Sequence, residues 1–305
     1  MSETAELDDE VIAERRHLLS LAFRMLGTIA EAEDAVQETY ARWYRLPPAE
    51  RDGIASPVAW LTRVASRVCL DVLGSARVRR ERYVGPWLPE PVPPGAFGET
   101  PGTASASGDP LDRVSLDESV STALLLVLES MTPAERVAFV LHDVFAMPFD
   151  EIAEAVGRSP AACRQLAASA RRRVTAHRRR EVSREEHDRV VRAFAEATQG
   201  GDLASLVAVL DPDAVLRADG GGVVSAARNP VLGAERVARF LLGLGRKHPQ
   251  IEVLPQETPD GLGFVMWEEG RIIAVVTVGV ADGRVAELRM MRNPEKLTLW
   301  RDVPA

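Results

Sequence analysis

Two side chains suited to reading DNA bases, Arg164 and Gln165, lie side by side near the start of a predicted helix. A guanidinium can form two hydrogen bonds with guanine, and a glutamine amide can form two with adenine. The same helix ends in three arginines, Arg171, Arg172 and Arg173, whose charges suit phosphate oxygens. This pattern is typical of a helix that enters the major groove of double-stranded DNA.

The elements around these side chains form a predicted helix-turn-helix over residues 131–174. Its first helix starts at Thr132, a cap residue followed three positions later by Glu135. A tight turn at Gly157 leads to a second cap, Ser159, and the last helix. Basic helical hairpins also occur in bundles that never bind DNA, so a solvated surface helix remains the alternative. The residues expected on the outward face of this helix are Ala161, Ala162, Arg164, Gln165 and Ser169.

Composition bounds the kind of protein this is. The chain has 305 residues, 27% of them charged, and a formal net charge of -8, yet arginine gathers at 77–82 and at 171–184. DNA binding would therefore depend on local patches. Cys69 and Cys163 show no metal or redox spacing, so no metal or cofactor is predicted. No apolar stretch is long enough to span a bilayer and no secretion signal is recognised, so we expect a cytoplasmic protein without membrane contact.

The order of patterns along the chain predicts its domains. A segment crowded with Pro, Gly, Ser and Ala separates two helical regions, and after residue 183 helical periodicity gives way to strands with glycine turns. The predicted fold is two all-α modules, the second a helix-turn-helix, followed by an α+β domain with a curved antiparallel sheet. The predicted ranges are 1–83 for the first module, 84–110 for the linker, 111–182 for the second module and 183–305 for the α+β domain.

Hydrophobic periodicity and turn residues predict the elements within these ranges. Asp282-Gly283 marks a hairpin between the last two strands. The expected helices are 11–26, 29–44, 57–80, 149–156, 185–199, 202–210 and 234–246, and the expected strands are 250–256, 262–268, 271–280 and 284–291.

Two surfaces of the first module suggest partners. Polar residues between Glu31 and Glu38 gather on one helix face, which suits docking to a basic or helical partner, although an ordinary solvated face would look the same. Trp60, Arg63 and Tyr83 accompany the basic run at 77–82, a mixture suited to phosphates and unstacked bases. Trp60 could equally belong to the core.

Both helical modules resemble bacterial sigma factors of the extracytoplasmic-function type. The resemblance rests on EDAVQETY at 33–40, AWLTRVA at 59–65 and TPAER at 132–136. It implies binding to core RNA polymerase through its β′ and β subunits, with the first module on the β′ clamp helices and the minus-ten element, and the second on the minus-thirty-five element. The implied polymerase-binding residues are Asp34, Gln37 and Glu38. Those for the minus-ten element are Trp60, Arg63, Ser66, Arg67, Arg77 and Arg80, and those for the minus-thirty-five element are Ser159, Ala161, Ala162, Arg164, Gln165, Arg171 and Arg172.

Three further segments, WLPEP at 87–91, DGGG at 219–222 and NPEKL at 293–297, resemble the SigJ-like subgroup, which carries a fused SnoaL-like domain. That domain has the cone-shaped α+β fold of ketosteroid isomerases and polyketide cyclases. The resemblance implies that the domain controls the sigma factor, that no separate anti-sigma factor is required, and that an unidentified small ligand could enter the domain. The implied regulatory interface comprises Trp87, Leu88, Asp219, Gly220, Gly221, Asn293, Pro294, Lys296 and Leu297.

Other functions stay open at this point. One is a ligand-sensing helix-turn-helix regulator that acts without polymerase. Another is an enzyme on a DNA-binding carrier, for which Asp219 is the one plausible base, although an aspartate before glycines more often belongs to a turn. Trp87 could simply cover a core edge. We expect no catalytic residue.

Overall fold

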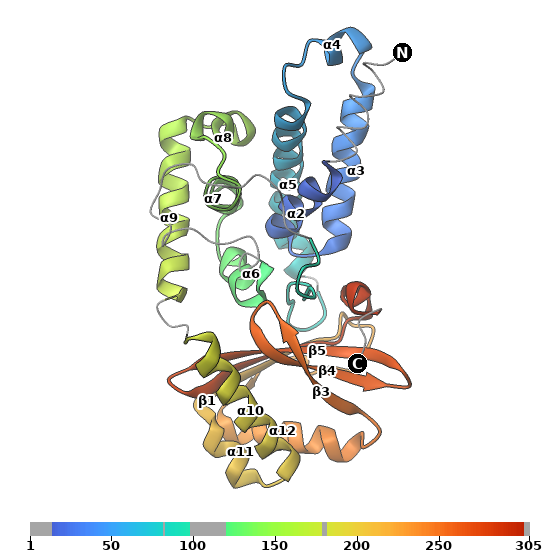
Figure 1. Ribbon diagram of the computed structural model, residues 1–305, viewed down its shortest axis with the longest axis vertical. Coiled ribbons are helices and arrows are strands. Elements are labelled where there is room, and N and C mark those ends of the chain that lie inside the picture. Colours follow the sequence, from blue (N-terminus) through green and yellow to red (C-terminus); the bar gives the residue numbers. More distant parts are fainter. Residues whose placement is uncertain (1–13, 82, 98–119, 179–181, 302–305) are drawn as a thin grey trace. The chain divides into compact units, whose positions relative to one another are not determined.

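The computed structural model describes residues 14–81, 83–97, 120–178 and 182–301, with the side chains at 76–81 and at 178 left out. The chain divides into two compact units (Figure 1). The first holds most of both helical modules, and the second comprises Arg80–Ala96, Val120–Leu126 and Thr175–Ala305. The linker start and the first residues of α6 therefore belong to the unit of the α+β domain.

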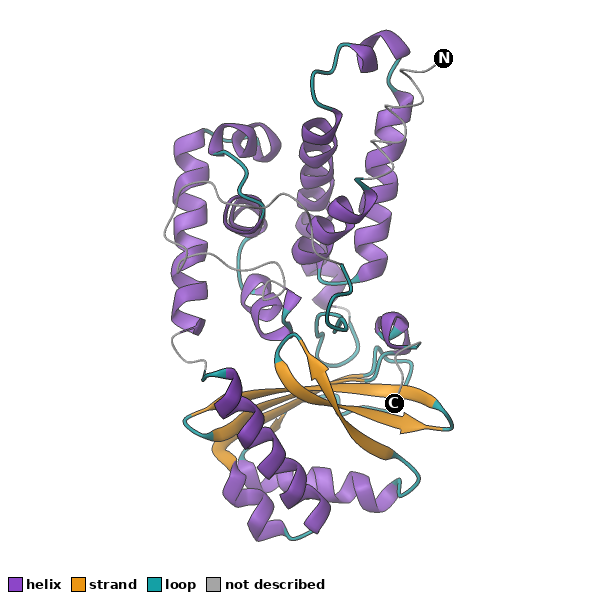
Figure 2. Ribbon diagram, in the orientation of Figure 1, coloured by secondary structure: helices purple, strands orange, loops and turns teal. Residues whose placement is uncertain are grey.

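Helices build the described part of the first unit (Figure 2). The predicted capping box at Thr132 and Glu135 is confirmed, and α8 ends at Gly157, which has a φ of +69° as the predicted tight turn requires. The elements are α2 (Arg15–Leu26), α3 (Ile29–Arg45), α4 (Pro48–Asp52), α5 (Pro57–Glu81), α6 (Thr122–Glu129), α7 (Pro133–Phe139), a π-helical turn (Val140–Val144), α8 (Phe149–Val156) and α9 (Pro160–Arg178).

A buried arginine joins the helices of the first unit. Arg136 in α7 is 3% exposed. Its guanidinium donates to the carbonyls of Leu128 at 2.9 Å and Met25 at 2.8 Å, and pairs with Glu129. Burial lowers the pKa of Arg136 to about 10, so it stays a cation at neutral pH. Because Met25 lies in the last turn of α2 and Leu128 lies in α6, a single side chain ties the first module to the helix-turn-helix module.

The second unit is built on a six-stranded sheet in the order β2-β1-β6-β5-β4-β3. The sheet is mixed rather than antiparallel, because β1 runs parallel to β6 while the other pairs are antiparallel. Its elements are α10 (Arg184–Gly200), α11 (Leu203–Val209), β1 (Leu210–Asp219), β2 (Val231–Leu232), α12 (Ala234–Lys247), β3 (Glu252–Thr258), β4 (Gly261–Glu268), β5 (Arg271–Ala281), β6 (Arg284–Met291) and two short 3₁₀ helices, Pro294–Lys296 and Thr298–Trp300.

The two faces of this sheet bury different parts of the chain. Figure 1 shows α10, α11 and α12 on one side of the curved sheet, where Phe264, Met266 and Leu288 join the larger core. Strand side chains alternate between faces, so Val265 and Met291 point to the other side. There they pack with a smaller cluster that includes linker and C-terminal residues. The members of this cluster are Leu88, Val265, Val275, Met291, Leu297 and Trp300.

Several sequence predictions differ from the structure. Strand β1 was not predicted, because it opens with Leu210-Asp211-Pro212-Asp213, which reads as a turn, and its register shifts between Leu210 and Val215. The short elements α4 and β2 were also missed. Ser169 does not face outward from α9, since its hydroxyl donates to Glu135 at 2.8 Å. The hairpin at Asp282-Gly283 is confirmed, with both residues at positive φ.

Candidate functional site

The start of α9 presents the side chains that were predicted to read bases. Ser159 accepts a hydrogen bond from the Ala162 N–H at 3.2 Å and so caps the helix. Arg164 and Gln165 are exposed, as is Ala161, whereas Cys163 is fully buried. The helix therefore turns one face inward and leaves its first two turns open on the other. The Arg164 guanidinium lies 5.3 Å from the centre of the Phe149 ring, a contact that restrains a long flexible side chain.

The three arginines at the end of α9 differ in their surroundings. Arg171 is half-buried and donates to Asp143 at 2.6 Å, and Arg173 donates to the Ser130 carbonyl at 2.8 Å. Arg172 is exposed. A phosphate role is thus argued most directly for Arg172, since Arg171 already has a carboxylate partner.

The surfaces of the first module lie on α3 and α5. On α3, Asp34 and Gln37 are exposed, and Glu38 accepts from Arg42 at 2.8 Å. This hydrogen bond lowers the pKa of Glu38, which keeps the carboxylate ionised. The polar side chains predicted to share one face of α3 are therefore accessible at Asp34 and Gln37.

The predicted promoter-melting segment is the first half of α5. Trp60 is half-buried with its ring 5.2 Å from that of Trp43, so it combines a core contact with partial exposure. Arg67 is exposed, and Arg63 pairs with Glu154 of α8. Ser66 is fully buried and donates to the Thr62 carbonyl at 2.7 Å, so its hydroxyl is not on the surface. The backbone of Arg77 and Arg80 lies in the last turns of α5, and their side chains fall outside the described part.

The predicted regulatory residues come together in the second unit around a buried ion pair. Asp219, at the end of β1, is fully buried, and Lys296 is 6% exposed. The Lys296 ammonium lies 2.9 Å from the Asp219 carboxylate and donates to the Leu88 carbonyl at 2.7 Å. The ammonium also lies close to two aromatic rings, with the Trp87 ring centre at 4.3 Å and that of Tyr83 at 4.9 Å. The linker thus supplies most of the surroundings of this cation.

Asp219 binds the linker as well. Its carboxylate accepts from the Leu88 N–H at 2.9 Å and from the Tyr83 hydroxyl at 2.6 Å. The Asn293 amide donates to the same hydroxyl at 3.0 Å. Burial and the bond to Asp219 raise the pKa of Tyr83, so it remains a donor at neutral pH. We call this set, linker residues 83–91 with Asp219, Asn293 and Lys296, the linker clamp.

Apolar and polar contacts extend the clamp along the linker. Leu88 is 1% exposed in the smaller core cluster. The Trp300 indole donates to the Pro91 carbonyl at 2.8 Å, and the Thr298 hydroxyl donates to Glu90 at 3.3 Å. The linker is therefore an ordered part of the second unit here, and Trp87 and Leu88 belong to its interface. Leu297 is buried in the same cluster, whereas Pro294 is exposed.

The glycines after Asp219 allow neighbouring residues, including Asn293 of the clamp, to approach the backbone closely. Gly221 has a φ of +63°, and a Cβ there would overlap the Asn293 side chain. A Cβ on Gly220 would overlap the Val224 carbonyl. Only glycine fits both positions without displacing these neighbours.

The same contacts argue against a catalytic role for Asp219. Its carboxylate accepts from Tyr83, Leu88 and Lys296, and its Oδ1 also accepts from the Gly221 N–H at 3.0 Å. A general base must reach a substrate proton, and this carboxylate faces donors of the chain itself. The interpretation of Asp219 as a turn residue was incomplete, because its carboxylate also binds the distant linker. Tyr83, which the sequence grouped with DNA contacts, is a member of the clamp instead.

A second contact, not predicted from sequence, involves the β3–β4 turn. Asp260 accepts from the Thr122 and Ala123 N–H groups, both at 2.8 Å, so it caps the N-terminus of α6. The Arg289 guanidinium lies 3.8 Å from the Asp260 carboxylate, and both side chains are about 5% exposed or less. Because α6 is the first helix of the helix-turn-helix module, the α+β domain holds the start of that module as well as the linker.

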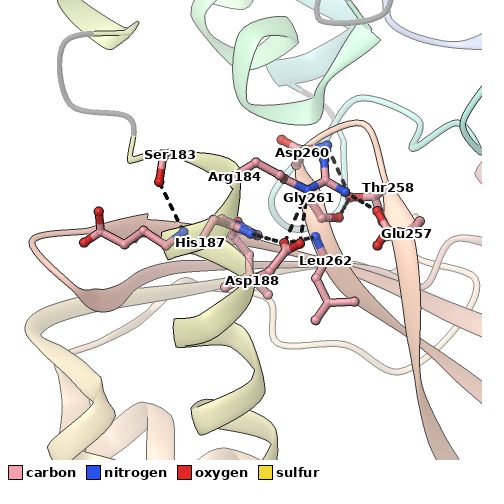
Figure 3. Close-up of polar contacts among 11 residues, drawn as sticks. Ser183, Arg184, His187, Asp188, Glu257, Thr258, Asp260, Gly261 and Leu262 are labelled. Atoms are coloured by element: carbon pink, nitrogen blue, oxygen red, sulfur yellow. Dashed lines mark hydrogen bonds and ion pairs between the residues drawn. The ribbon is translucent and has the colours of Figure 1, made fainter.

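Helix α10 supports the turn that carries Asp260 (Figure 3). The Leu262 N–H donates to Asp188 at 3.0 Å, and Arg184 pairs with Glu257. His187 is 7% exposed, with Nε2 2.9 Å from the Val278 carbonyl and Nδ1 3.1 Å from Asp188. Burial opposes ionisation of Asp188, but the hydrogen bond from the Leu262 N–H and the nearby Arg184 guanidinium outweigh it and lower the pKa of this carboxyl. Contacts with α10 therefore hold the β3–β4 turn in place.

This arrangement defines a class of protein: a transcription factor with two helical DNA-binding modules whose connection is bound by a fused α+β domain.

Among the described residues no helix is both long and apolar enough to cross a membrane, and no cluster of three or more metal-ligating side chains occurs.

Comparison with known proteins identifies the family. Residues 11–82 match the Sigma-70 region 2 family and residues 121–174 match the Sigma-70, region 4 family. The chain is 40% identical to the ECF RNA polymerase sigma factor SigJ of Mycobacterium tuberculosis, over 95% of this chain and 92% of the relative. The crystal structure of M. tuberculosis SigJ matches with a TM-score of 0.67 at 34% identity, covering 97% of this chain and 98% of that one. The chain belongs to the ECF sigma factors, alternative sigma factors that direct transcription initiation.

The first prediction concerns the cation of the clamp. Lys296→Met leaves the Asp219 carboxylate buried without its cation, a change that costs roughly 3–5 kcal/mol in buried pairs. We expect hydrogen exchange of the Leu88 amide to accelerate by about 100-fold or more, because its acceptor is released. Lys247→Met, at the exposed end of α12, is the matched control. Equal exchange in both variants would contradict the clamp.

The second prediction concerns the cap on α6. Asp260→Ala removes the acceptor of two helix N–H groups, and loss of a cap costs about 0.5–2 kcal/mol. We expect faster hydrogen exchange at Thr122 and Ala123, with Leu88 unchanged. Glu252→Ala, at the exposed start of β3, serves as control. Unchanged protection at Thr122 would show that α6 does not depend on Asp260.

Proposed function

We propose that the fused α+β domain controls this sigma factor by holding the connection between its two DNA-binding modules. The observation that carries the proposal is the buried Lys296–Asp219 pair, which bonds both the N–H and the carbonyl of Leu88 in the linker. A regulator that binds the connection can act on both modules, because the connection joins them.

The two contacts of the domain support this proposal together. The clamp binds residues 83–91, which follow directly after α5, and Asp260 binds the first turn of α6. These are the two ends of the segment that joins the modules. A chain fixed at both ends has fewer relative positions of its modules than an unrestrained one. By restricting these positions, the domain would determine which spacings between the minus-ten and minus-thirty-five elements the sigma factor can bind.

Specific residues are proposed for each partner. The exposed acidic face of α3 would bind core polymerase, and α5 and α9 would bind promoter DNA. We retain the predicted assignments for side chains that the structure leaves at least partly exposed, and we omit Ser66 because it is buried. The proposed residues are Asp34, Gln37 and Glu38 for polymerase, Trp60, Arg63 and Arg67 for the minus-ten element, and Ser159, Ala161, Ala162, Arg164, Gln165, Arg171 and Arg172 for the minus-thirty-five element.

We further propose that the domain has no catalytic activity and that no separate anti-sigma factor is required. The first point is supported by the occupied Asp219 carboxylate, and the second by the fact that the domain already binds the linker in the same chain. Action in the cytoplasm, where RNA polymerase works, follows from the family.

Run-off transcription with bacterial core RNA polymerase tests the proposed control. We expect Lys296→Met to change the yield of promoter-specific transcript by about fivefold or more, the usual range of coupling between sites, with affinity for core enzyme unchanged. More transcript would mean that the clamp inhibits, and less would mean that it assists. Transcript equal to that of Lys247→Met would contradict control through the clamp.

The DNA contacts of α9 give a further prediction. Arg164→Ala should lose about 1–3 kcal/mol of discrimination between promoter and random duplex, because a base contact is lost. Arg172→Ala should weaken binding to both duplexes alike and reduce the salt dependence, because a phosphate contact is lost. Fluorescence anisotropy over a salt series measures both effects. A uniform loss with Arg164→Ala would show that this side chain reads no base.

A further inference from the structure

A cavity of about 350 Å³ lies in the α+β domain on the sheet face that α10 and α12 cover. Leu216, Phe264 and Leu288 from three strands form its floor. Phe194 of α10 and Leu244 of α12 form its walls. A space of this size is in the range of sites for small organic molecules.

The chemistry of the lining restricts the ligand. Among the described residues, no Asp, Glu, Lys or Arg side chain lines the cavity. Its polar side chains are Thr198, Gln199 and His248, and the Thr198 hydroxyl already donates to the Phe194 carbonyl at 2.8 Å. A charged ligand would lose its hydration here without gaining an opposite charge, which is strongly unfavourable.

The opening of the cavity is apolar too. Val253 of β3 is 49% exposed and Pro255 is exposed beside it, while Gln199 and the half-buried His248 lie on the helix side. An exposed valine next to an apolar cavity extends the surface that an apolar molecule can cover.

We propose that this cavity binds an uncharged, predominantly apolar small molecule with a single polar group near Gln199 and His248. Removal of apolar surface from water drives the binding, and the walls offer water few hydrogen-bond partners to compete with it. The polar group orients the molecule at the opening.

The position of the cavity connects it to the linker clamp, a step that rests on the proposed function. Leu288 and Met290 of β6 line the cavity, and the same strand leads into Asn293 and Lys296. Leu216 of β1 lines it as well, and β1 ends at Asp219. A ligand that restrains these two strands therefore also restrains the residues that bind the linker.

The binding test uses two dyes with related ring systems on the full chain. N-phenyl-1-naphthylamine is neutral, and 8-anilino-1-naphthalenesulfonate carries a sulfonate. We expect the neutral dye to bind once per chain and about tenfold or more tighter than the anionic dye, because the lining supplies no cation. Absence of saturable binding by the neutral dye, or equal affinity for both dyes, would overturn the proposal.

Two glycines of α12 supply matched variants. Gly245 lines the cavity and Gly243 does not, and a Cβ at either position meets nothing within 4 Å. Positions two apart on a helix point to opposite sides, while Gly→Leu favours the helix equally at both. We expect Gly245→Leu to weaken binding of the neutral dye by about tenfold and Gly243→Leu to leave it unchanged. Equal effects of the two variants would place the dye elsewhere.

Coupling to the clamp is measured separately. Saturation with N-phenyl-1-naphthylamine should slow hydrogen exchange of the Leu88 amide in the full chain and in Gly243→Leu, and not in Gly245→Leu. Binding without this change would refute the coupling and leave the cavity as a site. Failure of the dye to bind would sink the site alone, because the transcription test with Lys296→Met examines linker control independently.

Discussion

The buried pair of Lys296 and Asp219 is the constraint on which the second unit depends. Two charges taken out of water are stable only when hydrogen bonds satisfy their remaining groups. Here Tyr83 and Leu88 supply donors to the carboxylate, and the Leu88 carbonyl accepts from the ammonium. The domain by itself therefore satisfies these buried charges only in part. Only with the linker in place is the site electrostatically complete, which gives the linker a defined position without a large interface.

The two faces of the sheet carry different sites, the cavity on the helix-covered face and the linker clamp on the other. Alternation along β6 sends Met290 to the helix-covered face and Met291 to the face that receives Leu88. The β3–β4 turn adds a third contact, through which Asp260 meets the first turn of α6. Rigid strands connect these contacts directly, whereas the loops at their ends carry the residues that bind.

Local signals explain what could be predicted from the sequence. Helices were recognisable because caps such as Thr132 and stops such as Gly157 act over a few residues. Strand β1 was not recognisable, since its start resembles a turn and its parallel pairing with β6 joins distant segments. The hydrophobic pattern alone could not reveal a mixed sheet.

The candidate site shows the same limit. Asp219 and Lys296 were identified through the resemblance, while the part played by Tyr83 depends on a contact across 136 positions of the chain. The cap of α6 by Asp260 spans 138 positions, and no local pattern marks an aspartate in one domain as the cap of a helix in another. Ser66 was assigned to DNA contact through the resemblance, and only the packing of α5 shows that it is buried.

The linker and its binding surface belong to one polypeptide, and this determines how the proposed control depends on the amount of protein in the cell. A tethered segment meets its site at an effective concentration that is often millimolar, whatever the amount of protein in the cell. Dilution cannot release it, and higher expression cannot titrate it. The ratio of bound to released linker is therefore an intrinsic property of each molecule, unlike that of a sigma factor held by a separate inhibitor.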